Sequence, residues 1–141
     1  MKPLAVVNNL VSKYGTRDPY ELADKMCFYI YFENLGTING YYSTAFDVKS
    51  IHINEKLSLK MRELTLAHEI GHAVMHPNLN INFMHQNTYM LKEKYEQQAN
   101  LFASYLLFPD EILVQYEGYS ADKIASILEV PTHIIDIRCK S

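Results

Sequence analysis

The chain has 141 residues, of which 48% are hydrophobic and 21% charged, and its formal net charge is −3. This length suits a single domain with its own core, and a slight negative charge without a basic cluster argues against nucleic acid as the main partner. No stretch approaches the roughly 20 apolar residues of a membrane span, the N-terminus does not resemble a signal peptide, and the two cysteines lack the spacing of a disulfide framework or a cysteine zinc site. We therefore expect a cytoplasmic globular protein with no membrane partner.

Hydrophobic periodicity and turn residues predict the elements of the first third of the chain. They are helices at 4–14 and 20–26, followed by strands at 27–32, 41–46 and 49–53. We expect these strands to form a three-stranded antiparallel sheet, with the last strand beside the helix that follows it. An exposed edge there could accept an extended peptide as an added strand, although an edge covered by a loop is an equal alternative.

A helix predicted over residues 59–75 carries the most informative motif, His68-Glu69-Ile70-Gly71-His72. Four residues of α-helix turn by about 400° and rise by about 6 Å, so both histidines project from one face and can reach one metal ion. Apolar residues recur at helical spacing around the motif, which indicates a largely buried helix where unpaired polar groups are costly. Glu69 lies beside this metal without ligating it, where a carboxylate can take a proton from zinc-bound water and pass it to a leaving amine. The motif predicts a hydrolytic zinc site.

A catalytic zinc uses three protein ligands and one open position for water, so a further donor is needed. Glu96 is the favoured candidate, on a second helix predicted over residues 92–108. It shares one stripe of that helix with Asn100, and small residues alongside would let this helix approach the motif helix closely. We expect Asn100, one turn later, to orient a ligand. Glu93 remains an alternative, although its position in the first turn also suits an interaction with the helix dipole.

Two other histidines are weaker candidates for the metal. His76 continues the four-residue spacing, but it lies about 12 Å along the helix axis from His68, too far for all three histidines to share one ion. Pro77 ends the helix, so we expect His76 to face the negative end of the helix dipole. His85 falls in a polar stretch, 77–88, that is predicted to be a loop, and we expect its side chain to be exposed.

The C-terminal part of the chain predicts further helices after Pro109. They cover residues 110–116, 121–129 and 132–138. The last two resemble half of a helix-turn-helix, but their acidic and basic residues balance and offer little attraction to phosphate. A packing or partner-docking role is therefore favoured over direct DNA binding, which is kept as the weaker alternative.

Three stretches strongly resemble the ImmA/IrrE metallopeptidases. They are Thr65-Leu66-Ala67-His68-Glu69-Ile70-Gly71-His72 with His76-Pro77, then Tyr95-Glu96-Gln97-Gln98-Ala99-Asn100-Leu101-Phe102-Ala103, and Leu106-Leu107-Phe108-Pro109. The resemblance implies a small zincin-like α+β domain, in which the sheet packs on the HExxH helix and on a second, ligand-bearing helix, with a helical C-terminal tail. It also implies that His68, His72 and Glu96 bind the metal and that Glu69 is the catalytic acid and base. Members of this family are often carried by phages and other mobile elements of bacteria, and typically cleave a partner repressor.

Two functional hypotheses follow. The first is a gluzincin-like, zinc-dependent endopeptidase that cleaves a helix-turn-helix repressor; its domain would cover 1–141, with a catalytic core at 1–109 and a helical extension at 110–141. The second is a non-catalytic metal-binding module that docks on such a repressor. Glu69 favours the first, because a structural zinc site has no use for an unligated carboxylate beside the metal. One ion is expected, zinc or another divalent ion such as manganese. Tyr89, Tyr95 or a strand tyrosine would stabilise the oxyanion.

Overall fold

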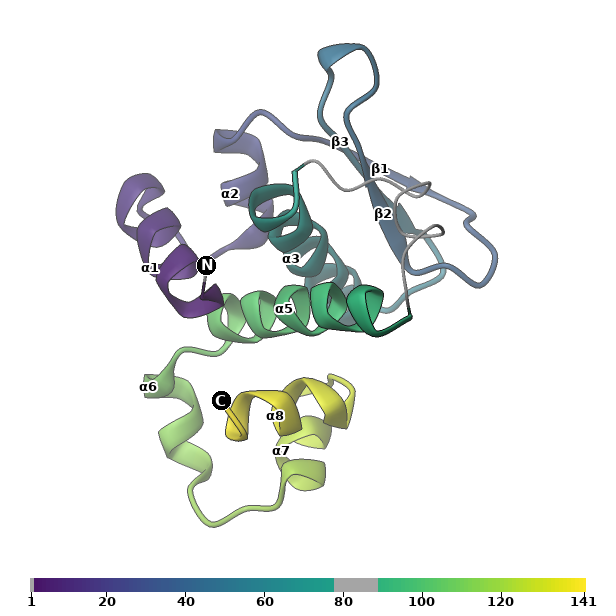
Figure 1. Ribbon diagram of the computed structural model, residues 1–141. Coiled ribbons are helices and arrows are strands. Elements are labelled where there is room, and N and C mark those ends of the chain that lie inside the picture. The colour runs from purple at the N-terminus through teal and green to yellow at the C-terminus, as the bar shows by residue number, and fades with distance from the viewer. Residues whose placement is uncertain (1, 78–88) are drawn as a thin grey trace.

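The structure is a computed structural model that describes residues 2–77 and 89–141, with only the backbone for 89–91 (Figure 1). Its elements are α1 (Pro3–Tyr14), α2 (Pro19–Lys25), β1 (Tyr29–Glu33), β2 (Gly40–Ser43), η1 (Ala45–Asp47), β3 (Ser50–Asn54), α3 (Leu59–Met75), α5 (Tyr89–Leu107), α6 (Asp110–Leu113), η2 (Val114–Tyr116), α7 (Ala121–Leu128) and α8 (Thr132–Cys139). The order of helices and strands agrees with the prediction, and the α+β class is confirmed. The second strand ends earlier than expected, because Phe46 and Asp47 adopt positive φ angles of 56° and 62°, which no extended strand allows.

The sheet has the order β1-β3-β2 and is mixed, so the prediction of an antiparallel sheet was wrong. β2 is antiparallel to β3, but β1 runs parallel to it. The chain between β1 and β2 crosses the end of β3 instead of forming a hairpin, and Asn54 holds it there. The Asn54 side-chain amide donates to the carbonyls of Gly36 at 2.9 Å and Ile38 at 3.0 Å, and its backbone N–H donates to the Asn39 carbonyl at 2.8 Å.

β3 is therefore the central strand, and the expectation that the last strand forms an edge was also wrong. Among the described residues, β2 is the edge strand that packs against α3, and it pairs with β3 alone. Gly40 allows β2 to lie against α3, since a Cβ there would meet Thr65 Cγ2 at 2.7 Å. Ile51 and Ile53 on the inner face of β3 are fully buried against the helices.

Helix α3 begins and ends where the sequence predicted. Ser58 caps its N-terminus by accepting a hydrogen bond from the Met61 N–H at 3.2 Å. The helix packs on the sheet on one side and on α5 on the other (Figure 1). Gly71 permits the close approach to α5, because a Cβ at that position would lie 2.9 Å from Phe102 Cδ1. The polar side chains of α3 and α5 are thereby brought close to one another.

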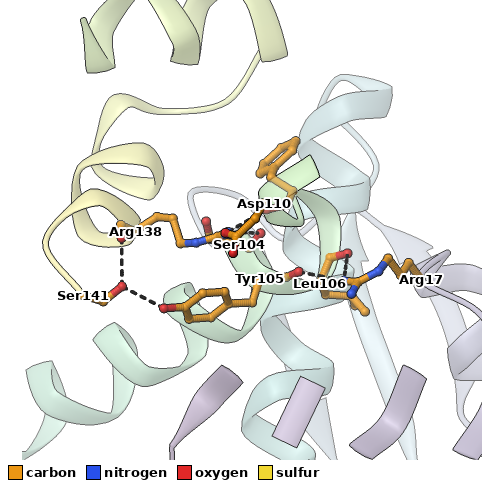
Figure 2. Close-up of polar contacts among 8 residues, drawn as sticks. Arg17, Ser104, Tyr105, Leu106, Asp110, Arg138 and Ser141 are labelled. Carbon is orange, nitrogen blue, oxygen red and sulfur yellow. Dashed lines mark hydrogen bonds and ion pairs between the residues drawn. The ribbon is translucent and has the colours of Figure 1, made fainter. Parts of the chain in front are cut away.

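Helix α8 packs on α5 and α7 packs on α8, and in Figure 1 both lie on the side of α5 away from the sheet. Ile134 and Ile135 of α8 are buried in the common core. Arg138, only 7% exposed, donates to the Phe108 carbonyl at 2.6 Å and the Ser104 carbonyl at 3.2 Å, and its guanidinium lies 4.1 Å from the centre of the Tyr105 ring (Figure 2). These contacts attach α8 to the C-terminal end of α5. Among the described helices, none is both long and apolar enough to cross a membrane.

Candidate metal centre

Helix α3 presents His68 and His72 one turn apart, with their Nε2 atoms 3.1 Å from each other. Glu96 of α5 reaches both: its Oε2 is 3.1 Å from His68 Nε2, and its Oε1 is 2.9 Å from His72 Nε2. Zinc bonds of about 2.0–2.1 Å in a tetrahedral arrangement separate ligand atoms by about 3.3 Å. The three donors are thus spaced nearly as one zinc ion requires, and their chemistry, two imidazoles and one carboxylate, fits such an ion.

The structure brings together the residues that the sequence singled out. His68, His72 and Glu96 form the one group of at least three potential metal ligands among the described residues. Glu93, the alternative to Glu96, is exposed on α5. Asn100 lines the same cleft next to His68, and its role in orienting a ligand stays a prediction. His85 lies outside the described residues.

Glu69 lies beside the three donors without joining them. Its Oε2 is 3.9 Å from His68 Nε2, and the residue is only 8% exposed. Burial raises the pKa of Glu69, and the neighbouring histidine charges only partly oppose this. A buried carboxyl with a raised pKa is suited to accept a proton and to release it again.

The charges of the donors are balanced in the absence of a metal ion. Burial lowers the pKa of His68, but its hydrogen bond with Glu96 and the charges of Glu69 and Glu96 outweigh this effect, so the pKa is raised. Burial likewise raises the pKa of Glu96, but hydrogen bonds from His68 and His72 hold it well below its usual range. A raised pKa of His68 favours its protonated form, so binding of a metal ion through this histidine would have to displace a proton.

The donors lie in an open cleft of about 810 Å³. Its walls come from β2 with the preceding loop, from α3 and α5, and from the start of α8, where Pro131, His133 and Ile134 contribute. Tyr41 and Tyr42 of β2 line it, whereas the Tyr95 ring packs edge-on against His76 at 4.5 Å, and the Tyr89 side chain lies outside the described part of the chain. A group with three donors in an open cleft resembles a catalytic metal site more than a closed structural one.

Comparison with known proteins identifies the family. The model of the IrrE N-terminal-like domain, peptidase family M78, matches residues 23–140. The chain belongs to this family. It is 35% identical to Metallopeptidase ImmA of Bacillus subtilis (strain 168), with 94% of this chain and 80% of that protein covered. It is 37% identical to the uncharacterized immunity region protein 2 of Bacillus phage phi105, with 95% of this chain and 87% of that protein covered.

Membership of the IrrE N-terminal-like family confirms the resemblance that the sequence motifs indicated. The matched region includes α8, whose contribution to the cleft was not predicted. His76 lies at the C-terminal end of α3, where it was expected, but its burial and its contact with α5 were not predicted. It is buried at the end of α3, with Nδ1 3.1 Å from His72 Nδ1 and Nε2 2.7 Å from Gln98 Oε1. The spacing of His72 and His76 could have indicated the first contact, but the second depends on the packing of α5 against α3.

Proposed function

We propose that the protein is a zinc-dependent endopeptidase in which His68, His72 and Glu96 bind the metal and Glu69 is the catalytic acid and base. One observation carries this proposal: a buried, unliganded carboxylate lies next to three metal donors in an open cleft. Zinc held by these donors would supply Lewis-acid polarisation of the attacking water and of the scissile carbonyl. Glu69 would take the proton from that water and deliver it to the nitrogen of the leaving amine. Asn100 would keep the His68 ring in its ligating orientation.

The edge strand β2 offers a track for the substrate. An extended peptide could add to β2 in the manner of a further strand, with its scissile bond over the donors. Gly40 supports this arrangement, because β2 lies close against α3 there and lines the same cleft as the histidines. Burial raises the pKa of Tyr42, so its hydroxyl stays protonated and could donate to the developing oxyanion.

The substrate that we propose is a helix-turn-helix repressor of a phage or another mobile element. Two facts support it: the resemblance to the ImmA/IrrE peptidases implies such a substrate, and the phage relative is named for an immunity region. A net charge of −3 is consistent with a protein partner and with no direct contact to nucleic acid. We further propose that the enzyme acts in the cytoplasm. Residues 1–141 would work as one domain, in which the segment 110–141 adds a wall of the cleft to the catalytic core at 1–109.

The test is incubation of the zinc-loaded protein with the helix-turn-helix repressor encoded beside it, with fragments identified by mass spectrometry. We expect cleavage by the wild type, and a rate at least about 100-fold lower for Glu69→Gln, whose zinc content should stay normal because Glu69 is not a ligand. Glu96→Ala should lose the zinc itself. Glu93→Gln, which changes an exposed carboxylate on the same helix, is the matched control and should cleave like the wild type.

Equal cleavage by wild type and Glu69→Gln would refute the role of Glu69. Stable binding of the repressor without cleavage by the zinc-loaded wild type would instead favour the docking module. Both outcomes are distinguishable from misfolding, because zinc content and thermal unfolding are measured on the same samples.

A further inference from the structure

His76 occupies an unusual position for a histidine that is not among the grouped donors. It follows the last residue of α3, and its backbone N–H donates to the His72 carbonyl at 2.8 Å. The side chain turns inward, where it is 7% exposed and its ring packs edge-on against Tyr95. Both ring nitrogens face polar atoms: Nδ1 lies 3.1 Å from His72 Nδ1, and Nε2 lies 2.7 Å from Gln98 Oε1.

Two imidazole nitrogens at hydrogen-bond distance must differ in protonation, since one has to donate and the other to accept. A histidine that binds a metal through Nε2 needs a lone pair on that atom, so its proton is on Nδ1. In the metal-bound protein His72 is therefore the donor through Nδ1, and His76 Nδ1 is the acceptor. The proton of His76 then lies on Nε2, from which it is donated to Gln98.

The opposite arrangement fails at the metal. If His76 donated from Nδ1, His72 would carry its proton on Nε2 and could not be a ligand. His76 Nε2 would then be a bare lone pair facing the carbonyl oxygen of the Gln98 side chain, an acceptor facing an acceptor at 2.7 Å. In the side-chain orientation that the structure shows, Gln98, on the helix that also carries Glu96, thus favours one tautomer of His72, since the other would require its amide to turn over.

We propose that His76 and Gln98 are positioning residues that hold His72 in its metal-binding tautomer and orientation. The inference rests on the proposed metal site but not on the proposed peptidase activity. Partners of this kind typically change metal affinity by about 10- to 100-fold when they are removed. Helix α5 carries both Glu96 and Gln98. Its packing on α3 therefore places Glu96 next to the histidines and, through the contact of Gln98 with His76, orients His72.

The test measures zinc affinity by competition with a chelating indicator, so that no substrate is needed. His76→Phe keeps a ring for packing against Tyr95 but cannot accept a hydrogen bond from His72, and we expect zinc to bind about 10- to 100-fold more weakly. His76→Asn offers a carbonyl oxygen near the position of Nδ1 and should recover most of the affinity. Gln98→Leu should weaken binding, whereas Gln97→Leu, an exposed neighbour on the same helix, should not.

A spectroscopic measurement keeps the proposal testable if a His76 variant does not fold. In the zinc-loaded wild type, ¹⁵N NMR of the imidazoles should find the proton of His72 on Nδ1 and that of His76 on Nε2. A proton-free Nδ1 on His72 would overturn the proposal. It would also be overturned if His76→Phe bound zinc as tightly as the wild type, or if His76→Asn bound as weakly as His76→Phe. If His76→Phe binds zinc more weakly than the wild type, but the zinc-loaded wild type does not cleave the repressor, this inference is supported while the proposed peptidase activity is refuted.

Discussion

The contact between Gly71 and Phe102 determines how closely the two ligand helices approach, and Gly71→Ala tests it. The added Cβ would lie 2.9, 3.0 and 3.1 Å from three carbons of Phe102, including its Cβ. Carbon atoms pack best at about 3.5–4.0 Å, so α5 would have to move away by about half an ångström or more. Such overpacking costs about 1–3 kcal/mol. Replacing glycine by alanine inside a helix returns about 1 kcal/mol, which leaves an expected net loss of about 1 kcal/mol.

The same displacement should weaken zinc binding, because Glu96 is on α5 and the histidines are on α3. Ligand distances have to be kept to within about 0.2 Å. We propose to measure the free energy of unfolding of the metal-free proteins in urea, and zinc affinity separately. Phe102→Leu, combined with Gly71→Ala, should make room for the new methyl group, with a favourable coupling of about 1–2 kcal/mol in a double-mutant cycle.

Three results would refute this reasoning. Gly71→Ala could be more stable than the wild type, as helix propensity alone predicts. Its zinc affinity could be unchanged. The two substitutions could also be additive within about 0.5 kcal/mol, which would mean that the residues do not interact.

Other predictions concern pH and the C-terminal helix. Burial raises the pKa of Glu69, so folding of the metal-free protein favours the protonated carboxyl; this stabilisation is present below the ordinary pKa of 4.5 and is lost as pH rises through the raised pKa. Glu69→Gln should therefore stabilise the metal-free protein at pH 7 but not at pH 4 in thermal unfolding, and equal effects at both pH values would contradict this. Because the pKa of His68 is raised above 6.5, zinc affinity should fall by about tenfold per pH unit for each displaced proton below that pKa, whereas a flat titration would exclude proton displacement. Arg138→Met should cost about 2–4 kcal/mol in urea unfolding, because the Phe108 carbonyl loses its buried donor. Asp110→Asn, at a side chain that is 94% exposed, should change stability by less than about 0.5 kcal/mol, and equal costs for the two variants would assign the effect to the surface ion pair.

Local patterns were sufficient to predict the elements that hold the donors. Helix α3 could be located because its apolar residues repeat at helical spacing and Pro77 follows it. The same periodicity identified Glu96 in preference to Glu93, since it gives the face of α5 that meets α3. These signals depend on residues within a few turns of one another.

Contacts between distant segments could not be predicted in this way. The loop that crosses the end of β3 is held by the Asn54 side chain, which donates to carbonyls that lie 16 and 18 residues earlier in the chain. An alternating pattern is the same for a parallel and an antiparallel neighbour, so β1 gave no sign of its direction. The contact of His76 with Gln98 and the contribution of Ile134 to the cleft likewise arise only when whole helices pack together.

The cleft is assembled from segments that the ribosome synthesises at different times. The histidine pair emerges with α3, the carboxylate follows only with α5, and the wall around Pro131 and Ile134 comes with α8. A growing chain therefore carries two histidines without their acidic partner, and later a metal site without one side of its cleft. A cleft with all of its walls therefore exists only after translation has passed α8.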